Sequence, residues 1–198
     1  YGILSRYSYN LDYHIVFNRI LENISKELIR VGVKNHASVD ISDIDERYAS
    51  YLSNMGFLGK NQFLINKKYG SYLYLATILI DKDLTKTEIR LDDCGECRIC
   101  IDACPSNALD DGFNKDLCIS SITQDKKAFN LQEISYLKTM VYGCDICQKV
   151  CPKNKGIDFK IHPEFEPSGI ENINLLDLLE MSNKEYKNIY GSNASSWK

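Results

Sequence analysis

The segment CGECRICIDACP, residues 94–105, decides the fold, because it places four cysteines and a proline on one short stretch of chain. Its spacing is Cys94-x2-Cys97-x2-Cys100-x3-Cys104-Pro105, which is the spacing that holds a [4Fe–4S] cluster in two-cluster iron–sulfur proteins. Three thiolates on a tight loop can bind three corners of one cube, whereas the fourth lies further along and ligates the other cluster. The pattern therefore predicts an iron–sulfur module with more than one cluster.

A second run, Cys144-x2-Cys147-x3-Cys151-Pro152, repeats this pattern without its leading cysteine. Cys118 is the one thiol that neither run uses, so eight cysteines serve two clusters with none left over. We predict the ligands of cluster I to be Cys94, Cys97, Cys100 and Cys151, and those of cluster II to be Cys104, Cys118, Cys144 and Cys147.

Two other uses of the cysteines are weaker. A zinc ribbon built from the pairs Cys94/Cys97 and Cys144/Cys147 would leave four cysteines unexplained, including both that precede a proline. Disulfides predict no particular spacing, and none of the eight cysteines lies in the first 93 residues. Metal-bound thiolates in a reducing cytoplasm fit the pattern better.

Composition bounds the class of protein. The chain has 198 residues, 44% of them hydrophobic, and a net charge of −3, without the overall basic excess of a simple nucleic-acid binder. The net charge does not exclude a local basic patch. No stretch reaches the length of a membrane span, and no signal peptide is recognisable. Because the sequence starts at Tyr1 rather than at methionine, we expect a piece of a longer chain.

Hydrophobic periodicity predicts an α+β fold. Apolar residues at helical spacing favour helices over residues 12–32 and 42–56, each range ending at a glycine. Short apolar runs separated by the turn KKYG favour two strands. The expected strands are QFLIN (62–66) and SYLYLATILI (71–80), and two further helical segments are NLLDLLEMS (174–182) and NKEYKNIYG (183–191).

The texture of the sequence changes twice, which predicts three parts: residues 1–91, a cluster-binding part at 92–156, and residues 157–198 as a linker and the start of a helical tail. A ferredoxin needs only the middle part. We therefore expect the flanking residues to hold whatever receives the electrons.

Several segments resemble epoxyqueuosine reductase, in the same order and over nearly the whole chain. They are SRYSYNLDYH (5–14), VDISDIDERYASYLSNMGFLGKN (39–61), YGSYLYLATIL (69–79), CISSITQ (118–124), GCDICQKVCP (143–152) and the final SNASSWK. The split second cysteine run makes the resemblance specific.

This resemblance implies a cobalamin-dependent iron–sulfur enzyme that reduces epoxyqueuosine to queuosine at the wobble position of tRNA. The implied fold is a mixed α/β cobalamin-binding part, similar to that of reductive dehalogenases, followed by a ferredoxin-like module with two [4Fe–4S] clusters and a helical tail. It also implies that the family's N-terminal portion and C-terminal helical extension are missing here. The implied partners are tRNA and an external electron donor, for a cytoplasmic monomer that binds no membrane.

The family's proton donor matches Asp40, with Glu46 as the alternative. An ion pair between Glu46 and its neighbour Arg47 would lower the pKa of Glu46 and make it a poorer proton donor, so we favour Asp40. A helix cap explains Asp40 as well. The sequence VDISDIDER departs here from many relatives, which carry a proline and more apolar residues.

The resemblance also implies which side chains contact cobalamin: Asp40, Lys60, Ser71, Tyr74, Ser120 and Thr123. Each has an ordinary structural explanation, such as a helix-to-strand turn for Lys60 or a helix N-cap for Ser120. His14 is not assigned as a cobalt ligand, because the D-x-H-x-x-G signature is absent, and we expect it to be a packing or cofactor-edge group.

Two other functions remain open at this point. A related corrinoid reductase acting on an organohalide would share the cofactors. A ferredoxin-type electron carrier with an accessory domain would share only the clusters, and would bind no corrinoid on reconstitution.

Overall fold

The computed structural model describes residues 1–8, 10–40, 43–85, 92–157, 162–166 and 171–197. The chain forms two compact units, each assembled from separate stretches of sequence. Unit 1 comprises Tyr1–Asp12, Arg98–Cys151 and Lys160–Lys198, and unit 2 comprises Tyr13–Cys97 and Pro152–Phe159. The three predicted parts at 1–91, 92–156 and 157–198 follow other boundaries and stay a prediction.

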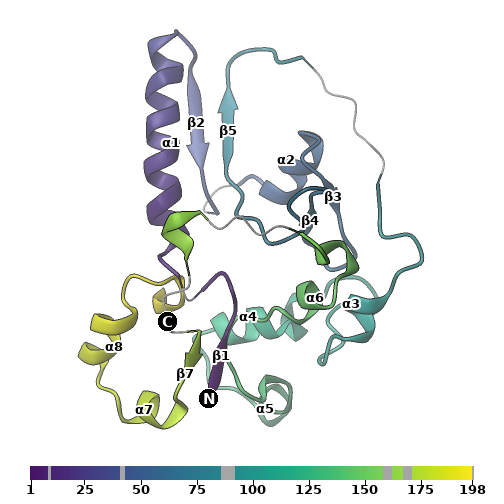
Figure 1. Ribbon diagram of the computed structural model, residues 1–198, viewed down its shortest axis with the longest axis vertical. Helices are drawn as coiled ribbons and strands as arrows, with labels where there is room; N and C mark the ends of the chain where they lie inside the picture. The colour runs from purple at the N-terminus through teal and green to yellow at the C-terminus, as the bar shows by residue number, and fades with distance from the viewer. Residues whose placement is uncertain (9, 41–42, 86–91, 158–161, 167–170, 198) are drawn as a thin grey trace. The chain divides into compact units, whose positions relative to one another are not determined.

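Unit 2 begins with the long helix α1 (Tyr13–Arg30), which confirms the helix predicted from periodicity. The helix runs alongside strand β2 (Asn35–Ser38), as Figure 1 shows, and buries Val16 and Leu21. Strand β2 pairs antiparallel with β5 (Thr77–Ile80). Gly32 follows α1 with φ of 77°, a left-handed conformation that ends a helix at little cost when the residue is glycine.

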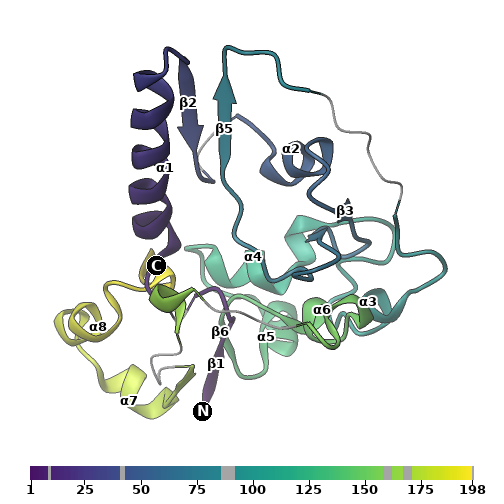
Figure 2. The same cartoon turned by 45° about the horizontal axis from the view of Figure 1, so that its top comes forward.

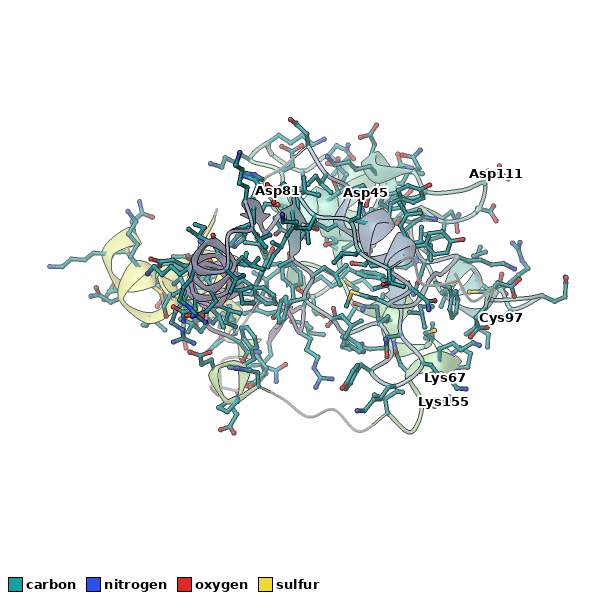
Figure 3. The ribbon with its side chains drawn as sticks, turned by 90° about the horizontal axis from the view of Figure 1, so that it is seen from above. Asp45, Lys67, Asp81, Cys97, Asp111 and Lys155 are labelled. Atoms are coloured by element: carbon teal, nitrogen blue, oxygen red, sulfur yellow. The ribbon has the colours of Figure 1, made fainter. Side chains whose placement is uncertain are left out.

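Helix α2 (Glu46–Leu52) is shorter than predicted at both ends. The expected start at Ser42 lies outside the described residues. In the described part, Asp45 stands at the N-terminus of α2 (Figure 3), and its carboxylate accepts hydrogen bonds from the backbone N–H of Arg47 at 3.0 Å and of Tyr48 at 3.1 Å. These bonds satisfy two amides that have no partner inside the helix, so the helix begins here.

The hairpin of β3 (Phe57–Leu58) and β4 (Leu64–Ile65) follows α2. Both predicted strands are too long, since 62–66 reduces to β4 and 71–80 to β5. Asn66 stops β4, because its side-chain oxygen accepts hydrogen bonds from the amides of Lys68 at 2.8 Å and Tyr69 at 3.0 Å and turns the chain. β4 also pairs with β3 rather than with β5.

Asn154 ties the returning stretch Pro152–Phe159 into unit 2. Its Oδ1 accepts a hydrogen bond from the Ser71 amide at 2.8 Å, and its Nδ2 donates to Ser71 Oγ at 2.9 Å. Ser71 is 2% exposed. This paired contact therefore joins residues 83 positions apart in the sequence.

Unit 1 contains a three-stranded sheet in the order β6–β1–β7. Its strands are β1 (Gly2–Leu4), β6 (Met140–Tyr142), which is parallel to β1, and β7 (Asn172–Ile173), which is antiparallel to it. Helices α7 (Leu175–Glu180) and α8 (Asn183–Tyr190) follow β7 at the yellow end of the chain (Figure 2) and confirm the predicted tail helices. Leu4, Tyr142, Ile173 and Tyr190 form the core that these elements share.

The cysteines of unit 1 lie on or beside four other helices, α3 (Ile99–Asp102), α4 (Ile119–Gln124), α5 (Leu131–Leu137) and α6 (Ile146–Lys149). Helix α3 packs on α6, and α4 packs on α5 around Ile119, Ile122 and Leu137. The 3-10 helices of the described residues are Lys115–Leu117, Pro152–Asn154, Pro163–Phe165 and Ala194–Trp197. The predicted mixture of helix and sheet is confirmed.

Each helix of the described residues is too short or too polar to cross a bilayer.

Replacing Asn154 by alanine should lower the free energy of unfolding by about 1–3 kcal/mol, because the buried amide of Ser71 loses its acceptor. Urea denaturation followed by circular dichroism measures this change. Lys155→Ala, at the exposed neighbouring position, is the control and should change stability by less than about 0.5 kcal/mol. Equal stability of the two variants would contradict the role given to Asn154.

Candidate functional site

Five cysteine thiols gather inside unit 1, namely Cys100 and the four predicted for cluster II. Burial is the largest cause that raises the pKa of Cys144 to about 11, and the nearby thiols of Cys118 and Cys104 contribute to this rise. Burial also raises the pKa of Cys147, helped by the charges of Cys144, Cys118, Cys100 and Cys104. Such mutual effects require the thiols to lie close together, which is the arrangement predicted for cluster II.

The chemistry of these thiols suits metal binding. A buried thiol keeps its proton unless something compensates the thiolate, and bonds to iron provide that compensation. Among the described residues, no three Cys, His, Asp or Glu side chains converge tightly enough to hold a single metal ion. A [4Fe–4S] cluster takes its four thiolates on four different iron atoms, so its ligands surround a volume rather than one point.

The two cysteine runs have matching backbones, which reinforces the prediction of two clusters. Helices α3 and α6 are each four residues long, and Cys100 and Cys147 occupy the second position of each. The residues before the helices, Arg98 and Asp145, have φ, ψ of −125°, 6° and −111°, 6°. Each helix then leads within two residues to a Cys-Pro pair, so the chain builds the same ligand loop twice.

A buried hydrogen bond connects the Cys118 segment to the Cys144 segment. Thr123 Oγ1, on the helix that Cys118 begins, accepts a hydrogen bond from the Gly143 amide at 2.8 Å and donates to the Ser120 carbonyl at 3.0 Å. Thr123 is fully buried. Gly143 has φ of 72°, and a side chain there would collide with Ser5, so glycine is required beside Cys144.

Asp145, directly after Cys144, anchors the same run to the chain that follows β1. Its Oδ2 accepts a hydrogen bond from the Arg6 amide at 2.7 Å. Burial raises the pKa of Asp145, and this hydrogen bond opposes the rise. The N-terminal strand therefore holds the second cysteine loop in place.

Cys94 and Cys97 belong to unit 2, and Figure 3 labels Cys97. The Lys60 amide donates to Cys94 Sγ at 3.5 Å, and Lys60 Nζ donates to the Gly95 carbonyl at 2.6 Å. Amide donors of this kind stabilise a thiolate sulfur and help set the potential of a cluster bound to it. Because Cys100 and Cys151 belong to unit 1, the ligand set of cluster I stays a prediction.

Asp40 lies in a polar and aromatic setting of unit 2. Tyr13 Oη donates a hydrogen bond to the Asp40 carboxylate, and His14 Nε2 lies 3.3 Å from the same oxygen. The Tyr13 ring stacks between His14, with centroids 4.3 Å apart, and Tyr74, at 4.7 Å. Asp40 itself has φ of 56°, which is uncommon for a residue other than glycine and points to a functional or structural constraint.

Glu46 was discounted as the proton donor because an ion pair with Arg47 would lower its pKa, and this expectation is wrong. Burial raises the pKa of Glu46, and the charge of Asp40 adds to this rise, whereas a backbone hydrogen bond from Asp40 and the nearby His14 oppose it. Arg47 does not pair with Glu46, because its guanidinium donates to the Gln62 carbonyl at 3.2 Å. Glu46 Oε1 instead accepts the Asp40 amide at 2.9 Å. The helix cap proposed for Asp40 is also wrong, since Asp45 caps α2.

The six residues predicted to contact cobalamin differ in how exposed their side chains are. Asp40 is exposed, and Tyr74 and Ser120 are half-buried. Ser71 and Thr123 are buried, with their hydroxyls engaged by Asn154 and by Gly143, which argues against direct cofactor contact. Lys60 is engaged with the Cys94 loop.

The sequence did not predict the contacts of two residues, Tyr13 and Asn154. Tyr13 contacts Asp40 across 27 positions of sequence, and Asn154 contacts Ser71 across 83. Both contacts depend on tertiary structure, so periodicity and local motifs could not reveal them.

Residues 93–154 match a family described as a 4Fe–4S double cluster binding domain. The match includes all eight cysteines, and so covers both runs together with Cys118. The predicted iron–sulfur module is thereby confirmed.

Similar proteins extend this likeness over the whole chain. The chain is 38% identical to the epoxyqueuosine reductase of Lactococcus garvieae and 36% identical to that of Bacillus subtilis, over all of its own length. The chain is therefore similar to epoxyqueuosine reductase over its whole length. It spans 58% and 52% of those two proteins, so it corresponds to little more than half of an epoxyqueuosine reductase.

Solved structures of epoxyqueuosine reductase agree with this homology. One, with an epoxyqueuosine-modified tRNA-Tyr stem loop, matches 99% of the chain with a TM-score of 0.93 at 36% identity, and the match covers 53% of that protein. Another, from Bacillus subtilis, has its catalytic aspartate loop swung out of the active site, and matches with a TM-score of 0.93 at 35% identity over the same shares.

Replacing Thr123 by valine should lower the free energy of unfolding by about 1–3 kcal/mol, because valine keeps the shape but leaves the buried Gly143 amide without an acceptor. Amide hydrogen exchange at Gly143 should become faster. Thr123→Ser retains the hydroxyl and is the control, in which exchange at Gly143 should stay slow. Slow exchange in the valine variant would show that the hydrogen bond does not hold this segment.

Proposed function

We propose that this chain is the part of an epoxyqueuosine reductase that binds two [4Fe–4S] clusters and contributes to a cobalamin site. The observation that carries the proposal is homology over the whole chain to epoxyqueuosine reductases, joined to a double-cluster match. The proposed substrate is epoxyqueuosine in tRNA, in line with the modified stem loop bound in a related structure. An external electron donor would supply the electrons.

The proposed ligands follow the spacing of the cysteines. Cluster I would be held by Cys94, Cys97, Cys100 and Cys151, and cluster II by Cys104, Cys118, Cys144 and Cys147. The mutual effects of the buried thiols of unit 1 support cluster II. Asp40, Tyr74 and Ser120 are the accessible residues proposed to contact cobalamin.

The reaction removes an oxygen atom from an epoxide. Both carbon–oxygen bonds break, a carbon–carbon double bond forms, and the oxygen leaves as water after taking up two electrons and two protons. The bound clusters would supply single electrons, and cobalamin would supply a low-valent cobalt centre for the difficult step. Asp40 would donate a proton to the departing oxygen, because an alkoxide is a poor leaving group. Tyr13 and His14 hold its carboxylate in place.

Replacing Cys118 by serine tests the crossed ligand sets. Anaerobic reconstitution with iron and sulfide should give roughly eight irons per parent chain and roughly four in the variant, which loses cluster II. Iron analysis and optical spectra measure the difference. If the Cys118→Ser variant binds as much iron as the parent chain, Cys118 is excluded as a ligand. If the parent chain takes up zinc in place of iron, both clusters are excluded.

Replacing Asp40 by asparagine should slow epoxyqueuosine reduction by roughly 100-fold or more, because asparagine keeps the size of the side chain but carries no acidic proton. Turnover of epoxyqueuosine tRNA by the protein reconstituted with clusters and cobalamin measures the rate. Binding of the tRNA should be little changed, which separates loss of chemistry from loss of substrate. An unchanged rate would remove Asp40 as the acid, and a chain that binds no corrinoid would favour an electron carrier.

A further inference from the structure

Lys60 belongs to the residues predicted to contact cobalamin, yet its amide and its ammonium group are both directed to the first cysteine loop. We propose that Lys60 is a positioning residue of cluster I, which holds the loop of residues 94–97 in place and makes the cluster easier to reduce. The inference rests on the proposed function, because Cys94 is a proposed ligand of that cluster. Lys60 acts through the ligand loop and does not touch the substrate.

Two groups of Lys60 contact neighbouring residues of this loop. The backbone N–H donates to Cys94 Sγ at 3.5 Å, and Nζ donates to the Gly95 carbonyl at 2.6 Å. These partners are 34 and 35 positions away in the sequence and belong to the same unit as Lys60. A lysine ammonium group is strongly hydrated and normally stays in water, whereas this side chain is half-buried against a ligand loop.

The turn that carries Lys60 has a well-determined backbone. It joins β3 to β4, and it is closed by hydrogen bonds from the Gly59 amide to the Phe63 carbonyl at 2.9 Å and from the Gln62 amide to the Gly59 carbonyl at 2.8 Å. Asn61, which is 4% exposed, accepts the Phe63 amide through its side-chain oxygen at 3.3 Å. The hairpin therefore presents Lys60 to the cysteine loop from a backbone that is itself held by hydrogen bonds.

Gly95 is also held from its amide side. Its N–H donates to Asp93 Oδ1 at 2.7 Å, and the Cys97 amide closes the loop by donating to the Cys94 carbonyl at 3.1 Å. An ammonium group thus binds the carbonyl of this glycine while a carboxylate binds its amide. Loss of the Lys60 contact would leave the loop with one of these two anchors.

The charge of Lys60 bears on electron uptake. Reduction adds negative charge to a cluster, and hydrogen bonds to its sulfurs and nearby charges help set its potential. The ammonium group, bound to the residue next to a sulfur ligand, favours the reduced form. The charge of Asp93 opposes this effect, whereas Asp92 is paired with Lys153 at 3.7 Å, and Glu96 is exposed to screening by solvent.

Lys60→Met tests the charge effect, because methionine keeps an apolar stem but carries neither a charge nor a donor. A potentiometric titration followed by EPR, on the reconstituted Cys118→Ser chain, reads cluster I without cluster II. Reduction should become roughly tenfold less favourable, a shift of about 59 mV to lower potential for a one-electron couple. Lys60→Arg should keep the potential, and so should the matched control Lys67→Met, at an exposed lysine of the same unit (Figure 3).

Asp93→Asn tests the same effect with Lys60 intact. Asparagine still accepts the Gly95 amide but carries no charge, so the potential of cluster I should rise.

A further readout needs no cluster. In the cofactor-free chain, amide hydrogen exchange at Gly95 and Cys97 should become roughly threefold faster or more in Lys60→Met, because the loop loses an anchor. Exchange in Lys67→Met should match the parent. An unchanged circular dichroism spectrum of Lys60→Met separates a loosened loop from an unfolded chain.

The outcomes distinguish this role from the proposed function. If Lys60→Met keeps both the parent potential and the parent exchange rates, the positioning role is overturned. If it loses corrinoid binding while the potential is unchanged, Lys60 serves cobalamin instead and the proposal is overturned. If Asp93→Asn lowers the potential, the assigned charge effect is wrong. If the parent chain itself binds no iron, the proposed function fails, and the role at cluster I fails with it.

Discussion

The hydrogen bond from the Gly143 amide to Thr123 Oγ1 is the contact on which the cysteine arrangement of unit 1 depends. Cys118 and Cys144 are separated by helices α4 and α5 and strand β6, and local structure alone cannot bring them together. The bond lies in a fully buried position, where an unpaired amide would be costly. It fixes the helix that follows Cys118 against the residue that precedes Cys144, and the left-handed Gly143 lets the chain pass close to Ser5.

Around that bond, the structure assigns different tasks to its polar side chains. Thr123 and Asp145 accept hydrogen bonds from backbone amides and so hold loops in place. The carboxylate of Asp40, by contrast, is bound by side chains and keeps nearly half of its surface exposed. Polar residues of the first kind define where the thiols stand, and those of the second kind are available for chemistry.

The sequence was most informative where spacing alone determines structure. The cysteine intervals predicted the double-cluster module, and periodicity predicted α1, α7 and α8. It was less informative where one side chain decides a boundary, as Asp45 does at the start of α2 and Asn66 at the end of β4. It could not reveal Tyr13 beside Asp40, because that contact exists only once α1 and the end of β2 are brought together.

The misjudged ionisation of Glu46 has the same physical origin. Adjacency in sequence suggested an ion pair with Arg47, but neighbouring residues on a helix point in different directions, about 100° apart around its axis. Arg47 consequently reaches the hairpin, at the Gln62 carbonyl, while Glu46 turns toward Asp40 and loses solvent. Burial raises the pKa of Glu46, whereas the Asp40 carboxylate stays nearly half exposed beside Tyr13 and His14. The different exposure of the two carboxyl groups, rather than adjacency in sequence, therefore sets their environments apart.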